Sequence, residues 1–196
     1  MRITIYNANT SANADALNSY VEDITHELQR HHDVRRIILR NHDLNYCNGC
    51  WNCWVKTPGK CVIKDDMEQV LQSFINSDLV IFASTMTMGF PSSLMKKVND
   101  RLIPLVHPYI TLVNDECHHV ERYSSYPDWG LILQKEANGK ESDIELVESI
   151  YRRTALNIKS ELKFTCTIDK PATEFVDEMN TIFSNHKQLE NEVNYI

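Results

Sequence analysis

Four of the six cysteines of the chain lie in the stretch CNGCWNCWVKTPGKC, residues 47–61. Cys47, Cys50 and Cys53 are spaced C-x2-C-x2-C, and Cys61 follows after seven further residues. Such compact spacing lets three thiolates of one loop bind three corners of an iron–sulfur cubane, while a more distant cysteine binds the fourth. The pattern therefore predicts a 4Fe-4S site on these four cysteines.

Zinc, disulfides and a metal-free loop are the alternatives for the same four cysteines. Zinc sites usually combine two separated C-x2-C pairs, which this stretch does not supply. Disulfides are rare in the reducing cytosol, where we expect this chain to reside. A loop of reactive or packing thiols without any metal is the remaining alternative. Trp51 and Trp54 can shield a cluster, stack on a flat ligand or anchor the loop.

The composition is that of an ordinary globular protein of 196 residues, and we expect one domain spanning 1–196. The net charge of −7 and the lack of a basic cluster argue against nucleic acid and against an anionic membrane surface. The N-terminus turns polar at Asn7 and lacks the apolar core of a signal peptide. No apolar run is long enough to span a membrane, so we expect a cytoplasmic protein.

Strand-like and helix-like segments alternate along the chain. Continuous or β-branched apolar runs predict strands near residues 3–6, 34–40, 78–84, 129–135 and 163–168. Apolar residues at helical spacing fall between and after them, and Pro91 is expected to open one of these helices. Five successive βα units predict an α/β fold with a doubly wound parallel sheet and helices on both faces.

Two segments interrupt this alternation: the cysteine-rich loop 44–64 and an inserted segment, 104–129. Within the insertion, residues 110–113 and 118–123 can pair as a hairpin across Asn114-Asp115. Its neighbouring His118 and His119 would point to opposite faces of a strand, which disfavours joint metal binding. We expect the hairpin to line the mouth of the active site or a dimer interface.

Ligands of doubly wound sheets bind outside the carboxyl ends of the strands. The chain lacks GxGxxG, which disfavours a dinucleotide-binding Rossmann domain and favours a flavodoxin-like sheet. In the first loop, residues 7–15, the side chains of Thr10, Ser11 and Asn13 and the helix N-terminus can hold a phosphate. The same residues can instead cap the helix, and Asp15 would repel a phosphate.

The third loop places Gly89 where backbone can approach a flat ligand, with Met86, Met88 and Phe90 as apolar surface beside it. The alternative is that these three apolar side chains belong to the core.

The chain resembles the flavodoxin-like NAD(P)H-dependent FMN reductase family, and within it the iron–sulfur flavoproteins. The resemblance rests on the order of elements and on three motifs: Gly89-Phe90-Pro91-Ser92-Ser93-Leu94, Asn99-Asp100-Arg101, and Cys61-x3-Asp65-Asp66-Met67. It implies the strand order 2-1-3-4-5. It also implies an FMN phosphate near Asn9, Ser11 and Asn13, and an isoalloxazine along Thr85, Met86, Thr87, Met88, Gly89 and Phe90.

The implied activity is an FMN-dependent oxidoreductase that takes hydride from NAD(P)H and passes electrons to a quinone, a small oxidant or a protein. A homo-oligomer is expected. The first loop has Ala8-Asn9 where the family usually has Gly-Ser, and Thr85 and Thr87 replace the usual Pro and Tyr, so FMN should be held more weakly. Two alternatives are a non-enzymatic flavin and iron–sulfur electron carrier and a flavin-poor binding or sensor protein.

Overall fold

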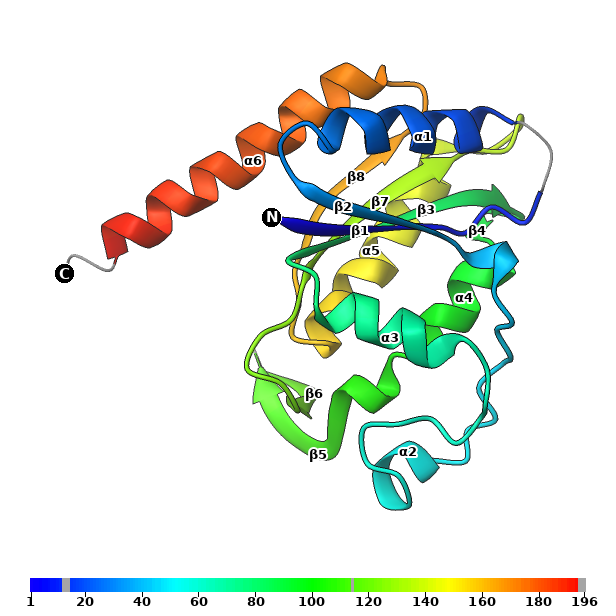
Figure 1. The fold of residues 1–196 in the computed structure, drawn as a ribbon, viewed down its shortest axis with the longest axis vertical. Coiled ribbons are helices and arrows are strands. Elements are labelled where there is room, and N and C mark those ends of the chain that lie inside the picture. Colours follow the sequence, from blue (N-terminus) through cyan, green and yellow to red (C-terminus); the bar gives the residue numbers. More distant parts are fainter. Residues whose placement is uncertain (12–14, 114, 194–196) are drawn as a thin grey trace.

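The computed structural model of the chain describes residues 1–11, 15–113 and 115–193, with side chains up to residue 183. Its centre is a sheet in the order β2-β1-β3-β7-β8, and all neighbours along this order are parallel (Figure 1). The predicted order 2-1-3-4-5 is confirmed. The strands are β1 (Arg2–Asn7), β2 (Asp33–Ile38), β3 (Leu79–Thr87), β7 (Asp128–Gln134) and β8 (Leu162–Thr167).

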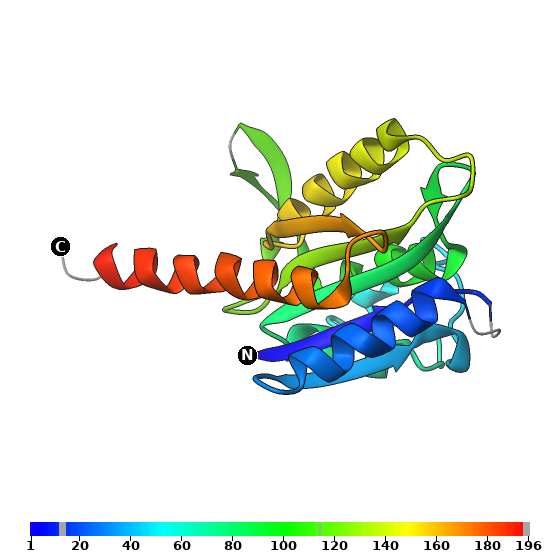
Figure 2. The ribbon, with the colours of Figure 1, turned by 90° about the horizontal axis from the view of Figure 1, so that it is seen from above.

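Helices cover both faces of the sheet, as predicted (Figure 2). One face packs on α1 (Ala16–Leu28) and α6 (Ala172–Val193), and the other on α3 (Met67–Ile75), α4 (Ser93–Asp100) and α5 (Glu141–Asn157). Alternate residues of β3 serve the two faces: Ile81 packs with α1, while Val80 and Phe82 pack on the opposite side. Burial on both faces is why β3 is a continuous apolar run rather than an alternating one.

Two local features differ from the sequence-based expectations. The second strand ends at Ile38, and residues Leu39–Asn41 form a 3-10 turn instead. Pro91 does not open a helix. It lies in the short strand β4 (Phe90–Pro91), which pairs antiparallel with the end of β3, and Ser92 caps α4 by accepting from the backbone N–H of Met95. Ser92 can cap because its side-chain oxygen replaces a missing intrahelical acceptor.

The predicted hairpin forms from β5 (Val106–Val113) and β6 (Glu116–Glu121), which make a separate two-stranded sheet (Figure 1). Asn114 of its turn lies outside the described residues. No helix within the described ranges is both long and apolar enough to cross a membrane.

Candidate functional site

The polar side chains of the first loop are engaged with one another. Asn9 is 1% exposed, its amide donates to the Asp15 carboxylate, and its oxygen accepts from the backbone N–H of Ser11 at 2.9 Å. Asp15 also accepts from the backbone N–H of Asn18 at 2.9 Å and so caps α1. Capping is therefore the observed role of Asp15. Thr10 is exposed, whereas Asn13, the other predicted phosphate contact, lies outside the described residues.

A basic group beside this loop comes from the 3-10 turn that follows β2. Arg40 Nη1 lies 3.4 Å from the backbone oxygen of Asn9 and 3.3 Å from the side-chain oxygen of Asn18, to which it donates. We did not predict Arg40 as a site residue. The parallel register of β1 and β2 pairs Asn7 with Ile38, so the segments that follow the two strands leave the sheet as neighbours. That register is the signal that could have identified Arg40.

The third loop is a tight hairpin between β3 and β4. Met88 and Gly89 both have positive φ, +53° and +75°, as hairpin turns of this kind require. Met88 is 93% exposed, and Gly89 N–H donates to Glu136 at 3.3 Å. The turn borders an open cavity of about 450 Å³, whose other walls come from residues 136–139 and Asp143.

The six predicted flavin contacts differ in their access to this cavity. Thr87 and Met88 are exposed and Gly89 is half-buried at the tip of the hairpin, and of these Met88 and Gly89 line the cavity. Met86 is 5% exposed in the core, and the half-buried Phe90 packs against the same core. Thr85 is half-buried in β3. All six assignments remain predictions.

The first and third loops are joined directly. Ser92 Oγ donates to the backbone oxygen of Ala8 at 2.6 Å, and Ser92 N–H donates to Ser84 Oγ at 2.9 Å. Both bonds are buried. The two loops implied in cofactor binding therefore form one rigid edge at the carboxyl ends of β1 and β3.

The cysteine-rich loop starts at that edge but carries its thiols elsewhere. It leaves β2 and descends to α2 (Asn52–Val55), well away from β4 (Figure 1). Trp54 Nε1 fixes α2 there by donating to the backbone oxygens of Ile103 and Val106, at 3.1 and 3.0 Å. The thiols thus lie near the C-terminal end of α4, whereas the β3–β4 hairpin precedes its N-terminal end. The cysteine-rich loop and the β3–β4 hairpin therefore both start at the carboxyl ends of parallel strands, but the cysteines themselves lie away from that edge.

All four cysteines of the loop line one small cavity of about 60 Å³, together with Arg101. Cys53 is buried, Cys61 is half-buried, and Cys47 and Cys50 are exposed. Burial and the nearby Cys61 thiol raise the pKa of Cys53. No three His, Cys, Asp or Glu side chains of the described ranges are placed to hold a single metal ion. The structure brings the predicted ligands together around one cavity, without bringing them to bonding distance of one point.

Arg101 faces this cavity from a buried ion pair with Asp65. The two side chains are 2% and 0% exposed. Burial disfavours the charged guanidinium, but hydrogen bonding to Asp65 and the influence of the nearby Cys61 outweigh it and raise the pKa of Arg101. The sequence signal was available: Arg101 falls three residues after Val98, on the apolar face of α4. A charged residue on such a face needs a buried partner.

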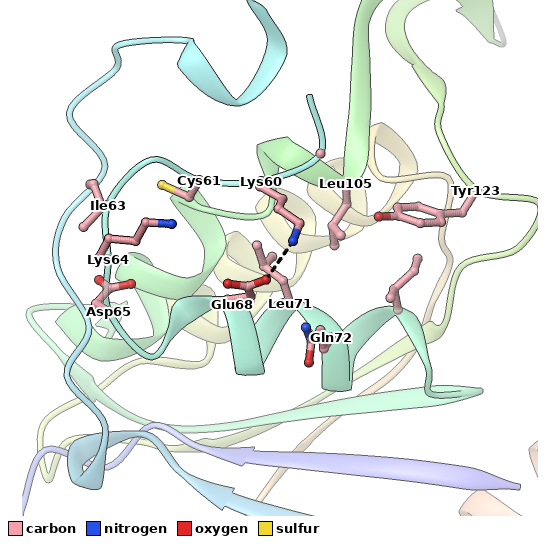
Figure 3. A pocket seen from close by; sticks show the side chains of 12 residues that line it. Lys60, Cys61, Ile63, Lys64, Asp65, Glu68, Leu71, Gln72, Leu105 and Tyr123 are labelled. Carbon is pink, nitrogen blue, oxygen red and sulfur yellow. Dashed lines mark hydrogen bonds and ion pairs between the residues drawn. The ribbon is translucent and has the colours of Figure 1, made fainter. Parts of the chain in front are cut away.

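A second pocket, of about 210 Å³, adjoins the cysteine cavity, and Cys61 and Ile63 line both. Lys60 and Glu68 face each other across it at 3.3 Å (Figure 3). Its apolar wall includes Leu71 of α3. Cys61 is therefore accessible from a surface pocket as well as from the cysteine cavity.

The remaining cysteine and histidine residues do not join these groups. His118 contacts Glu116 at 3.2 Å, whereas its neighbour His119 packs on Trp54, with ring centres 4.9 Å apart. The prediction that the two histidines point apart is confirmed. Burial raises the pKa of Cys166 to about 12, which keeps this thiol protonated.

Comparison with known proteins places the chain among flavin reductases. Residues 1–113 match the family described as NADPH-dependent FMN reductase. The chain is 35% identical over 75 residues to an iron–sulfur flavoprotein of Archaeoglobus fulgidus and 38% identical over 69 residues to one of Methanocaldococcus jannaschii. These matches cover 38% and 35% of the chain, but only 33% and 35% of the two relatives.

Solved structures share the fold. A putative quinone reductase from Klebsiella pneumoniae aligns with a TM-score of 0.61 at 13% identity, over 96% of this chain and 85% of that one. An FMN-dependent NADH-azoreductase from Bacillus anthracis, in complex with FMN, aligns with a TM-score of 0.60 at 9% identity, over 96% and 98%. At such identities the likeness concerns the fold alone.

Proposed function

The chain belongs to the NADPH-dependent FMN reductase family, and from this we propose that it is an FMN-dependent NAD(P)H oxidoreductase of the iron–sulfur flavoprotein type. One observation carries the proposal: the family match spans residues 1–113 and so includes both loops that Ser92 joins into one edge. Flavoproteins of this kind transfer hydride from a nicotinamide to the flavin, while the protein supplies binding and orientation.

The residues at this edge fit FMN in part. Met88 and Gly89 offer an exposed apolar and backbone surface beside an open cavity. Thr10, Ser11 and Arg40 would hold the phosphate, with Arg40 supplying the positive charge that the first loop itself lacks. FMN bound at this edge would be the group that accepts hydride.

The four cysteines fit an iron–sulfur cluster by donor type and by their common cavity. Cys53 is buried and Cys61 half-buried, whereas Cys47 and Cys50 are exposed, and all four would supply thiolate ligands to the cluster. We further propose that electrons leave to a quinone, another small oxidant or a protein, and that the protein acts in the cytoplasm as a homo-oligomer.

One observation favours a different function, that of a flavin-poor binding or sensor protein. Asp15 places a carboxylate at the N-terminus of α1, where a phosphate would otherwise find free N–H groups, and Asn9 is fully engaged in the loop. Such a protein would keep the cysteine cavity but bind FMN weakly or not at all.

Flavin titration separates these two functions. Apo-protein should quench FMN fluorescence, and the bound flavin should be reduced by NADH or NADPH with turnover in the presence of excess quinone. Gly89→Val should abolish quenching, because its side chain would occupy the backbone approach. Gly49→Val is the matched control: Gly49 also has positive φ, +62°, but lies in the cysteine loop. No quenching by wild type at high concentration would refute the oxidoreductase. Quenching and reduction without turnover would instead indicate an electron carrier.

Iron and labile sulfide test the cluster. After anaerobic reconstitution, serine at Cys47, Cys50, Cys53 or Cys61 should lower both together, because all four thiolates serve one centre. Cys117→Ser is the control, since Cys117 is exposed on the hairpin and lies outside the cavity. Wild-type protein without labile sulfide would refute the iron–sulfur cluster.

A further inference from the structure

Two of the three guanidinium nitrogens of Arg101 are held by hydrogen bonds. Its Nη1 and Nη2 both donate to the Asp65 carboxylate, the second at 3.0 Å, and Nη1 also donates to the backbone oxygen of Asn45 at 3.2 Å. Asp65 is fixed in turn by the backbone N–H groups of Asn45 and Met67, at 2.9 and 3.1 Å. A bidentate pair of this kind fixes the orientation of the guanidinium as well as its position.

The third nitrogen of the same guanidinium is unused. Arg101 Nε is buried and has no hydrogen-bond partner within the part of the chain that the structure describes. The Arg101 side chain is 2% exposed and lines the cavity that holds Cys47, Cys50, Cys53 and Cys61. A buried N–H without a partner is costly, so an unpaired donor on a residue that lines a cavity indicates an acceptor that binds in that cavity.

We propose that Arg101 is the positioning residue of the four-cysteine cavity: it orients Cys61 through Nε–H and supplies the positive charge that favours an anionic, electron-accepting centre. Asp65 fixes the guanidinium, and the sulfur of Cys61, once it acts as a thiolate ligand, accepts the free Nε–H. The redox part of this inference rests on the proposed function.

The positive charge of Arg101 should affect the reduction potential of the centre, because reduction changes the charge of that centre. Oxidation of one NAD(P)H to NAD(P)⁺ would release two electrons, and a cluster held by the four cysteines would gain one negative charge for each electron that it accepts. A fixed guanidinium beside the centre stabilises the reduced form, and hydrogen bonds to ligand sulfur act in the same direction. Removing Arg101 should therefore lower the reduction potential.

The decisive variant is the double exchange Asp65→Asn with Arg101→Gln. It removes the guanidinium without leaving the Asp65 carboxylate as a lone buried charge. The matched control is Lys96→Gln with Asp100→Asn, which removes an exposed ion pair from the surface of the same helix. Arg101→Lys is a second variant that keeps the ion pair and the charge but has no Nε donor.

Optical redox titration of the reconstituted protein is the first measurement. We expect the double variant to favour the oxidised form about tenfold more than wild type, a fall of about 59 mV for a one-electron couple. The control pair should leave the potential unchanged. Arg101→Lys should also lower the reduction potential, because it lacks the Nε donor. If the double variant does not fold, this single variant tests the inference. An unchanged potential in a folded variant would overturn the inference.

The charge beside Cys61 can also be measured without any cluster. In a background with serine at Cys47, Cys50 and Cys117, the metal-free protein is treated with an anionic and with a neutral aromatic disulfide. The ratio of the two rates does not depend on how much of the Cys61 thiol is ionised. We expect the rate with the anionic disulfide, divided by the rate with the neutral one, to fall about tenfold in the variant Asp65→Asn with Arg101→Gln. The reason is that a nearby guanidinium attracts only the anionic reagent.

The two measurements test the cluster and the positioning role of Arg101 separately. Wild-type protein that binds no iron and sulfide refutes the cluster, and the rate ratio then decides the role of Arg101 alone. A ratio unaffected by the double exchange refutes that role, whether or not a cluster forms.

Discussion

Replacing Asp65 with asparagine should destabilise the protein by about 3–5 kcal/mol at neutral pH, the usual cost of breaking a buried ion pair. The Asp65 side chain is fully buried and accepts from both Nη atoms of Arg101 and from two backbone N–H groups. Asparagine retains the shape but loses the negative charge. Arg101, itself 2% exposed, would remain as an uncompensated buried cation.

This destabilisation should depend on pH with a definite sign. Burial by itself raises the pKa of Asp65, but the bonds from Arg101 and from the backbone outweigh it and lower the pKa from 3.8 to about 2. A carboxyl whose pKa is depressed by folding contributes stability that is fully present above its unfolded pKa and is lost as the pH falls through the folded one. The difference between 3.8 and about 2 corresponds to about 2 kcal/mol.

Urea unfolding of both proteins under reducing conditions, from pH 7 to pH 2, measures this effect. The difference in unfolding free energy between wild type and Asp65→Asn should stay constant down to about pH 4. It should then shrink by about 2 kcal/mol toward pH 2. Asp78→Asn is the matched control, because Asp78 pairs with Arg2 at 2.9 Å but is 42% exposed, so its loss should cost about 1 kcal/mol or less. A difference that is equally small for both variants, or that does not change between pH 5 and pH 2, would contradict the role assigned to the buried pair.

Three further outcomes follow from single contacts. Gly130→Ala should destabilise by about 1–3 kcal/mol in thermal or urea unfolding, because its Cβ would lie 2.1 Å from Cζ of Phe164; a neutral effect would show that the ring moves freely. Cys166, whose pKa burial raises to about 12, should escape alkylation in the native protein at about pH 8 and react after unfolding, as mass spectrometry would detect. Trp54→Phe removes both hydrogen bonds from Nε1 to the segment 103–106 and should cost about 1–2 kcal/mol, with faster amide exchange in α2 but not in α1.

Local patterns in the chain were sufficient to predict the sheet and its helices. The run around Val80–Phe82 predicted a strand buried on both sides, and the stripe from Met67 to Ile75 predicted α3, because period-2 and period-3.6 spacing are properties of neighbouring residues. Boundaries were less predictable. Pro91 was expected in a helix but lies in β4, since pairing of Phe90 and Pro91 with the end of β3 competes successfully with helix initiation.

The sequence by itself determined which groups are available for chemistry, namely four cysteines at cluster spacing and a glycine in the loop that follows a buried strand. Only the tertiary structure decided where they lie. It places the thiols at the far end of α4, because Trp54 of α2 bonds to backbone some fifty residues later in the chain. It also brings Arg101 to Cys61, and Arg40 to the first loop. Spacing along a chain controls contacts between neighbours, whereas contacts across tens of residues depend on how helices and strands pack.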